Sequence, residues 1–109
     1  MASSKEYLQF ILEQLSGAES VTHRAMMGEY VLYDRGRIFG GIFDDRLLVK
    51  PTASARAMLP DAPEEPPYPG AKPMLVVENV DDREFLRALT EAMYPELPER
   101  KIRKRIKTR

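Results

Sequence analysis

The sequence predicts an α+β domain, in which helices cover one face of a single antiparallel β-sheet. Three observations predict it. An amphipathic helical pattern opens the chain, short β-rich segments joined by tight turns follow, and a second amphipathic helical pattern ends the globular part. The predicted order of elements is therefore α-β-β-β-β-α-β-α, with the sheet arranged as a meander.

The first helix is expected to begin at Ser3, because Ser3 and Glu6 form a capping-box pattern. Its buried face carries apolar side chains at positions i, i+3, i+4 and i+7: Leu8, Ile11, Leu12 and Leu15. Tyr7 and Phe10 widen that face. Gly17 suits the left-handed residue that follows the end of a helix, so the helix is expected to end there.

Four strands are expected at residues 21–25, 29–33, 37–43 and 46–50. Residues 34–36 suit a three-residue hairpin loop with Gly36 in the left-handed region. Asp44 and Asp45 suit a second tight turn, because aspartate tolerates that region better than most residues. Short turns between neighbouring strands indicate an antiparallel meander, which Pro51 ends.

The second half of the chain is expected to return one more strand to the sheet. Thr52 is expected to cap a short helix over residues 53–59. Residues 60–73 hold six of the nine prolines, which favours an extended connection rather than a helix or a central strand. An apolar, β-branched run at residues 74–78 then predicts a buried strand.

The last helix is expected to begin at Asp81, since Asp81 and Glu84 repeat the capping-box spacing. Its predicted buried face consists of Phe85, Leu86, Leu89, Ala92 and Met93. Pro95 and Pro98 are expected to end the helix, because proline cannot continue the hydrogen-bond ladder.

Charge is divided unevenly along the chain, although its 17 basic and 17 acidic residues cancel. Residues 99–109 contain seven Lys or Arg and one Glu, a net charge of +6, which leaves residues 1–98 with −6. We therefore expect one α+β domain over residues 1–98 and a basic tail over residues 99–109, either disordered or a helical extension.

The composition excludes several classes of site. No cysteine is present, which excludes disulfides, thiolate metal sites and a cysteine nucleophile. No apolar run approaches the ~20 residues that span a bilayer, and the N-terminal segment lacks the pattern of a signal peptide. The expected location is the cytoplasm, with no membrane partner.

No motif in the sequence predicts catalysis, a metal site or a cofactor. His23 is the lone histidine, and a surface or strand position is favoured over a metal ligand. No serine lies in a nucleophile elbow, and Gly40 and Gly41 lack the sequence context of a phosphate loop. Glycines inside a strand indicate a bulge or a close approach of backbone instead. The chain is therefore predicted not to be an enzyme.

The first candidate binding site is an interaction edge at Arg24, Met26, Met27 and Gly28. Two methionines at a strand junction could offer a soft apolar contact surface. In the more ordinary interpretation, one methionine fills the core and Gly28 permits a bulge.

The second candidate is the basic tail, whose side chains can neutralise the phosphates of nucleic acid or bind an acidic partner. Its predicted contact residues are Arg100, Lys101, Arg103, Lys104, Arg105, Lys107 and Arg109. Ile102 and Ile106 lie four residues apart, so the tail would be amphipathic if it were helical. A disordered, solubilising tail is the alternative, and two isoleucines offer too little apolar area to favour a membrane surface.

The segment from Arg24 to Pro51, with the later sequence YPGAKPML, resembles the N-terminal domain of the TfoX/Sxy competence regulators. The resemblance is carried by Arg24, Met26, Met27, Gly28, Tyr33, Gly36, Phe39 and the turn and strand at Asp44–Lys50. A late strand that leads into a helix completes the match, which extends over residues 3–95.

The resemblance implies a secretion-chaperone-like fold and a regulatory, non-enzymatic role. Full-length members of the family are linked to natural transformation and act with the cyclic-AMP receptor protein at certain promoters. Those proteins carry a second, helical domain, in whose place this sequence has the basic tail, so a stand-alone N-terminal domain is expected. We expect a protein partner and contact with nucleic acid through the tail; a homodimer with no nucleic-acid role is the alternative.

Overall fold

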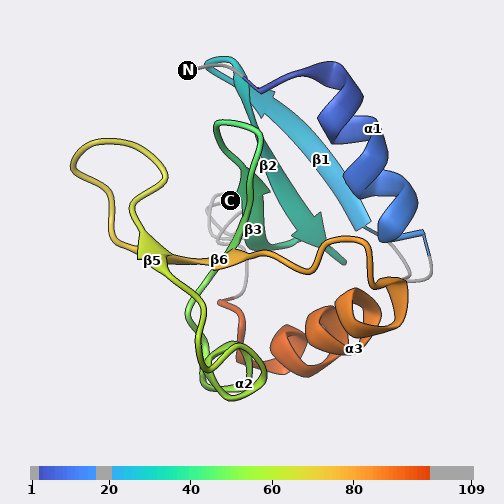
Figure 1. Cartoon of the computed structure of the whole chain (residues 1–109), viewed down its shortest axis with the longest axis vertical. Helices are drawn as coiled ribbons and strands as arrows, with labels where there is room; N and C mark the ends of the chain where they lie inside the picture. The colour runs from blue at the N-terminus through green and yellow to red at the C-terminus, as the bar shows by residue number, and fades with distance from the viewer. Residues whose placement is uncertain (1–2, 17–20, 99–109) are drawn as a thin grey trace, which may run out of the picture.

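A computed structural model describes residues 3–16 and 21–98 of the 109-residue chain. An antiparallel six-stranded sheet has the order β1-β2-β3-β4-β6-β5 (Figure 1). The strands are β1 (Val21–Met26), β2 (Glu29–Asp34), β3 (Arg37–Ile42), β4 (Leu47–Val49), β5 (Glu64–Glu65) and β6 (Met74–Val77). The helices are α1 (Lys5–Gln14), α2 (Ala53–Met58), α3 (Arg83–Met93) and the 3₁₀ turn η1 (Tyr94–Glu96). The predicted class and order are confirmed, and β5 adds a short edge strand that was not expected.

Three two-residue turns join the first four strands, and both residues of each turn have positive φ. The pairs are Met27–Gly28 (φ 54° and 85°), Arg35–Gly36 (51° and 85°) and Asp44–Asp45 (55° and 55°). Positive φ at both positions is the pattern of type I′ turns, whose twist matches that of antiparallel strands. The loop predicted at residues 34–36 is one residue too long, because Asp34 still pairs with Arg37 in the sheet.

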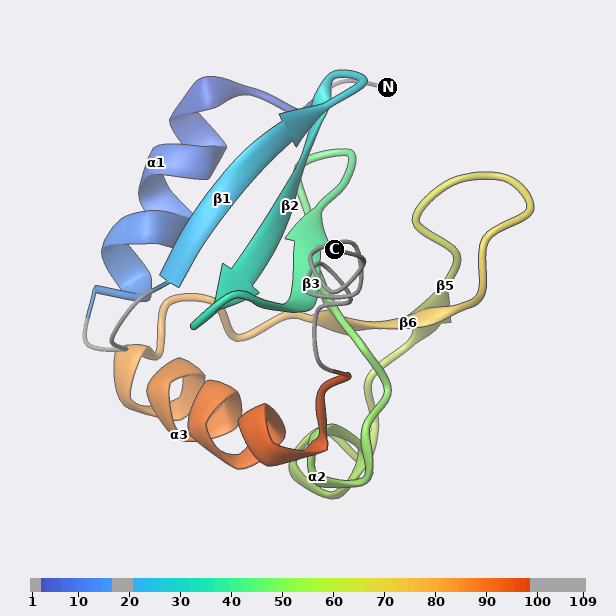
Figure 2. The same cartoon turned by 180° about the vertical axis from the view of Figure 1, so that it is seen from behind.

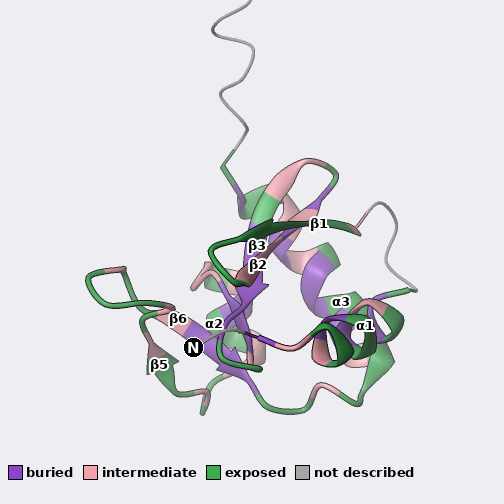
Figure 3. Cartoon of the chain, turned by 90° about the horizontal axis from the view of Figure 1, so that it is seen from above, coloured by how far each residue is buried: buried purple, intermediate pink, exposed green. Residues whose placement is uncertain are grey.

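The core lies between the helices and one face of the sheet. Leu47, Val49 and Leu75 point into it from the central strands and are at most 2% exposed. The helices contribute the apolar side chains of their inner faces: Leu8, Ile11, Leu15, Ala55, Leu86, Leu89 and Met93. Figure 3 shows exposed and buried residues alternating along α1 and α3, beside the buried centre of the sheet. The amphipathic patterns in the sequence therefore identified most of the buried helix faces.

The other side of the sheet, hereafter the second face, carries a smaller apolar cluster. Val31, Gly41, Leu48 and Val76 form one row across four strands, because each pairs with the next in the register. Leu48 and Val76 in this row pack with Phe43, and all three side chains are at most 7% exposed. The second face is thus apolar at its centre.

Gly40 lies where two strands approach closely. A Cβ atom at this position would lie 2.1 Å from the carbonyl oxygen of Leu48, so only glycine fits. The register also shifts beside it, since Leu32 pairs with Gly40 and Tyr33 with Ile38. The bulge or close approach expected for a glycine inside a strand is confirmed.

Both predicted capping boxes are displaced by one residue. Ser4, not Ser3, caps α1 by accepting a hydrogen bond from the Tyr7 amide, and Asp82, not Asp81, caps α3 by accepting from the Phe85 amide. Ser3 is recruited elsewhere, because its hydroxyl donates to Glu29 at 2.6 Å. Ser3 therefore makes a tertiary contact in place of the predicted cap.

The short helix α2 begins as predicted, with Thr52 accepting a hydrogen bond from the Ala55 amide. Its first turn is tied to η1, because Ser54 donates to Glu96 from both its amide, at 2.9 Å, and its hydroxyl, at 2.6 Å. These hydrogen bonds lower the pKa of Glu96 below its ordinary value. The contact fixes the end of the α3 segment against α2.

Candidate functional site

A groove lies between the tip of the β1–β2 hairpin and the proline-rich loop (residues 66–73) that joins β5 to β6. Its volume is about 660 Å³, and it is hereafter called the hairpin groove. Its lining residues are Met26, Met27, Glu29, Phe43, Pro67, Tyr68 and Pro69. A second hollow of about 460 Å³ shares Glu29 and the loop prolines and extends the groove past Asp44, Arg46 and Glu65. Figure 1 shows the loop (yellow) projecting from the sheet on the side of β5.

The two methionines are placed by the hairpin turn. Met26 ends β1, pairs with Glu29 and is 43% exposed, whereas Met27 occupies the first turn position and is 94% exposed. Gly28 is the second turn residue, with a φ of 85°. The interpretation that one methionine fills the core and Gly28 permits a bulge is therefore wrong, because the segment is a tight turn at the edge of the sheet.

Met27 combines backbone strain with full exposure. A side chain with a Cβ atom pays about 1–2 kcal/mol in the left-handed region, which glycine and asparagine occupy more readily. Met27 has a φ of 54° and packs against little of the domain, since 94% of it is exposed. Its side chain therefore contributes little to the stability of this fold, although its backbone conformation lowers that stability.

The floor of the groove is apolar and packed against the sheet. The ring of Phe43 lies over Gly41, because a Cβ atom on that glycine would come within 2.5 Å of Phe43 Cε2. Phe43 is only 6% exposed and packs with Leu48 and Val76. Tyr68 is 55% exposed and stands on the opposite wall, in a loop whose prolines limit its backbone freedom.

The groove and the hollow that extends it carry more carboxylates than cationic groups. Three carboxylates and one guanidinium stand along the two hollows: Glu29, Asp44, Glu65 and Arg46. Glu29 accepts hydrogen bonds from the Ser3 hydroxyl at 2.6 Å and from the Asp44 amide at 3.2 Å, and Arg46 is paired with Glu65. The surplus of carboxylates favours a cationic ligand.

The predicted interaction edge is brought only partly into this groove. Met26 and Met27 line it and Gly28 adjoins them in the turn. Arg24 lies two residues earlier on the same strand, opposite Val31, and does not line the groove. The contacts predicted for the basic tail lie outside the described residues: Arg100, Lys101, Arg103, Lys104, Arg105, Lys107 and Arg109.

Residues that the sequence did not single out complete the groove. Phe43 and Tyr68 are separated from the methionines by 16 or more positions, and they meet them only because β3, β5 and β6 belong to one sheet. The closely spaced prolines of residues 66–73 were the sequence feature that could have predicted this wall, since a stiff loop beside a strand end makes a stable wall. No spacing rule links that loop to the hairpin.

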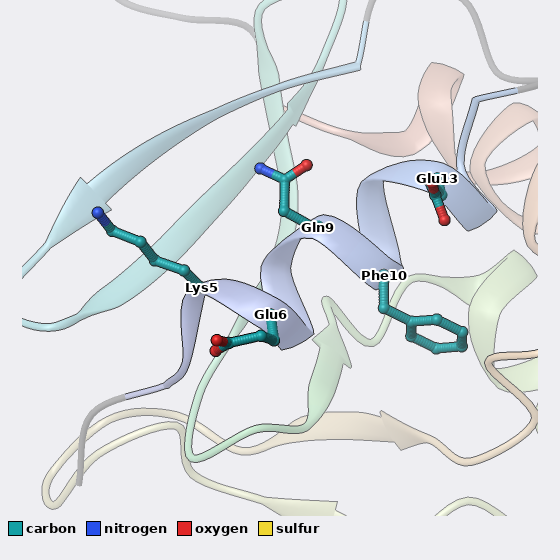
Figure 4. Close-up of a pocket in the computed structure, with 5 residues that line it drawn as sticks. All are labelled: Lys5, Glu6, Gln9, Phe10 and Glu13. Carbon is teal, nitrogen blue, oxygen red and sulfur yellow. The ribbon is translucent and has the colours of Figure 1, made fainter.

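Other hollows lack opposing walls or space. The hollow along α1 is lined by Lys5, Glu6, Gln9, Phe10 and Glu13, all from one helix, and Figure 4 shows Phe10 directed away from Lys5 and Gln9. A hollow of about 220 Å³ lies between the end of α2 and the start of α3. Neither combines lining residues from separate elements with a volume as large as that of the hairpin groove.

Within residues 3–16 and 21–98, no group of three or more histidine and acidic side chains is arranged to hold a metal ion. His23 is exposed on β1 with its ring edge against Tyr30, at a centroid distance of 6.2 Å. This confirms that His23 is a surface strand residue. The described helices are also too short and too polar to cross a bilayer.

Comparisons with known proteins identify a family whose matched segment includes the groove. The TfoX N-terminal domain family matches residues 13–99 of the chain. A Spirochaeta aurantia protein, described as an uncharacterized 12.7 kDa protein in the trpE 5′ region, is 35% identical over 80 residues, which cover 73% of this chain and 70% of that protein. No solved structure matches the chain. The family match includes every residue that lines the hairpin groove and ends at residue 99.

Proposed function

This chain belongs to the TfoX N-terminal domain family, and from that premise we propose that it is a non-catalytic regulatory module. The domain binds a protein partner through the hairpin groove, and the basic tail adds affinity for nucleic acid. The family resemblance to competence regulators supports the regulatory role. The groove supports a binding role rather than catalysis, because its walls are methionine, aromatic and proline side chains.

The strained and exposed Met27 is the observation that carries the proposal. A methionine at a φ of 54° with 94% exposure costs stability and adds little packing. Methionine is flexible and polarizable, which suits a surface that moulds itself to a partner. Met26 and Tyr68, both more than 40% exposed, extend the same apolar surface.

A photo-crosslinking experiment tests the groove as a contact surface. A benzoylphenylalanine residue in place of Met27 is expected to yield a discrete protein adduct in the native cell. The matched control carries the same residue in place of Phe10, which is 37% exposed on α1 and does not line the groove. Equal adducts at both positions, or none at position 27, would contradict the proposal.

A homodimer is the second candidate, and the free edge of the sheet favours it. β1 is an edge strand whose residues Thr22–Met26 are all exposed, so its outer backbone groups are available for pairing with another strand. Light scattering decides between the two candidates. A mass that rises with concentration to twice the chain mass supports the dimer, whereas a monomer at high concentration excludes it.

A further inference from the structure

We infer that residues 99–109, the basic tail, occupy the hairpin groove of their own chain. Ile106 rests on the apolar floor beside Phe43, and Ile102 lies nearer Ile38 at the start of β3. The Lys and Arg side chains of the tail face Glu29 and the carboxylates of the neighbouring hollow. The inference rests on the proposed function only in taking the groove as a binding surface, and it names the chemistry that this surface accepts: a cationic segment with spaced aliphatic side chains.

The groove has open volume beside apolar side chains, which suits the isoleucine side chains of the tail. The groove of about 660 Å³ is bordered by Met26 and Met27, which are 43% and 94% exposed, and by Tyr68 at 55%. Ile38 is 38% exposed and extends the apolar surface along the second face, because it pairs with Tyr33 on β2. Ile102 and Ile106 are the two apolar side chains of residues 99–109.

Charge complementarity selects the tail among possible occupants. Residues 99–109 carry a net charge of +6, and residues 1–98 carry −6. Glu29 lines the groove, and the hollow that extends it adds Asp44 and the paired Glu65 and Arg46, so carboxylates outnumber guanidinium groups over the two hollows. An acidic partner or the phosphates of nucleic acid would be repelled by these carboxylates, whereas the tail is attracted to them.

The length of the tail allows it to reach the groove of the same chain. The Leu97 carbonyl lies 3.4 Å from Arg37 Nη1, so the described chain ends beside the start of β3, and Figure 2 shows this end of the sheet opposite the β1–β2 hairpin. Phe43 lies six residues along from Arg37, about 20 Å at ~3.4 Å per residue. Residues 99–106 can span about 28 Å when extended, which is enough to pass the end of the sheet and follow the second face.

Occupation by the tail makes the groove and the basic residues mutually dependent. Nucleic acid that binds the Lys and Arg side chains withdraws the tail, and the groove is then open to a protein partner. A protein partner that fills the groove releases the tail for phosphates in the same way. The two binding activities are therefore expected to be positively coupled.

A nitroxide experiment tests the inference. The chain has no cysteine, so Thr108→Cys gives a single site for a nitroxide label, and the methionine methyl groups report proximity to it. We expect strong broadening of the Met26 and Met27 methyl signals and little broadening of Met58, on α2, or Met93, in the core. Equal broadening of all four, or none at Met26 and Met27, would overturn the inference.

Two further measurements distinguish the occupant and the forces. In a mixing experiment, the nitroxide is on one set of chains and the isotope label is on another. Broadening that appears only in this mixture would show that the groove binds the tail of a second copy, and it would overturn the intramolecular contact. A synthetic peptide of residues 99–109 is expected to bind the 1–98 chain, and Asp44→Asn is expected to weaken it about two- to fivefold. Glu13→Gln on α1 is the matched control, with no change expected.

The outcomes also separate this inference from the proposed function. Loss of the nitroxide effect together with a protein adduct at position 27 would leave the groove as a partner site without the tail. A nitroxide effect without an adduct would leave a groove that serves the tail alone. Each experiment therefore fails independently of the other.

Discussion

Met27 is a single residue that is both strained in its backbone and almost fully exposed. Type I′ turns favour Asn-Gly, because asparagine and glycine reach positive φ at low cost. Here the turn is Met-Gly, with a φ of 54° at Met27 and 85° at Gly28. Gly28 adopts its positive φ at low cost, whereas Met27 bears the backbone strain and its side chain points away from the domain.

Replacing Met27 with asparagine is expected to stabilise the domain and to weaken the proposed binding of a partner in the hairpin groove. Met27→Asn should raise the free energy of unfolding by about 0.5–1 kcal/mol, because asparagine tolerates the left-handed region. Urea denaturation of both chains measures the difference. Gly28→Ala is the matched control and should be destabilised, since alanine would be strained at a φ of 85°. A less stable Met27→Asn chain would show that Met27 makes stabilising contacts.

Gly40 is required by the close approach of two strands rather than by its backbone angles. Gly40→Ala should cost about 3 kcal/mol or more, because the new Cβ atom would meet rigid backbone instead of a movable side chain. That atom would lie 2.1 Å from the Leu48 carbonyl oxygen. Thermal and urea unfolding measure the loss.

Gly70 supplies the control for Gly40. It has a φ of 89°, and a Cβ atom added there would meet nothing within 4 Å, so Gly70→Ala adds conformational strain without a clash. We expect a loss of about 1 kcal/mol there. Similar losses at the two positions would show that β3 and β4 can separate at small cost.

At the scale of elements, capping positions were predicted to within one residue. The polar residues Ser3 and Ser4 are neighbours, as are Asp81 and Asp82, and both members of each pair are good caps. Asp45 decides between the serines, because its carboxylate accepts a hydrogen bond from the Ser4 amide at 2.8 Å. The local sequence could not show this contact, since it joins α1 to a turn 41 residues away.

The cap of α3 can be tested by matched substitutions. Asp82→Ala should lower the free energy of unfolding by about 1 kcal/mol, because the Phe85 amide loses its acceptor. Asp81→Ala, one residue earlier, should change it little. Chemical denaturation of the two variants measures both values, and a larger loss for Asp81→Ala would restore the capping box predicted from the sequence.

Over the whole molecule, acidic and basic residues are distributed unevenly along the sequence. Residues 1–98 carry −6 and residues 99–109 carry +6, so any attraction to nucleic acid is expected to reside in the tail. Such binding is expected to be weak, tolerant of sequence and sensitive to salt, because it depends on phosphate contacts and counterion release.

A salt series on a mixed-sequence duplex measures this property. If about five tail charges engage phosphates, log K should fall with log salt at a slope near −4.5. The 1–98 chain should not bind. A flat salt response of the full chain, or equal binding by both chains, would contradict a role of the tail in nucleic-acid binding.

The sequence by itself determined the α+β class, the helix faces and the tight turns of this protein. These features depend on neighbouring residues: apolar spacing along a helix, alternation along a strand, and Gly or Asp where the chain must reverse. The boundaries of most strands followed within one or two residues for the same reason. The unequal distribution of charge between residues 1–98 and 99–109 also needed no structure.

Only the tertiary structure decided the groove. Met26 and Met27 meet Phe43 and Tyr68 because β5 pairs with β6 and carries the proline-rich loop beside the hairpin. Such pairings join residues far apart in the chain, and their free energy depends on the packing of the whole sheet rather than on local preference. For the same reason the sequence could name two methionines as a candidate contact surface, but the structure was needed to place two aromatic side chains and Glu29 beside them.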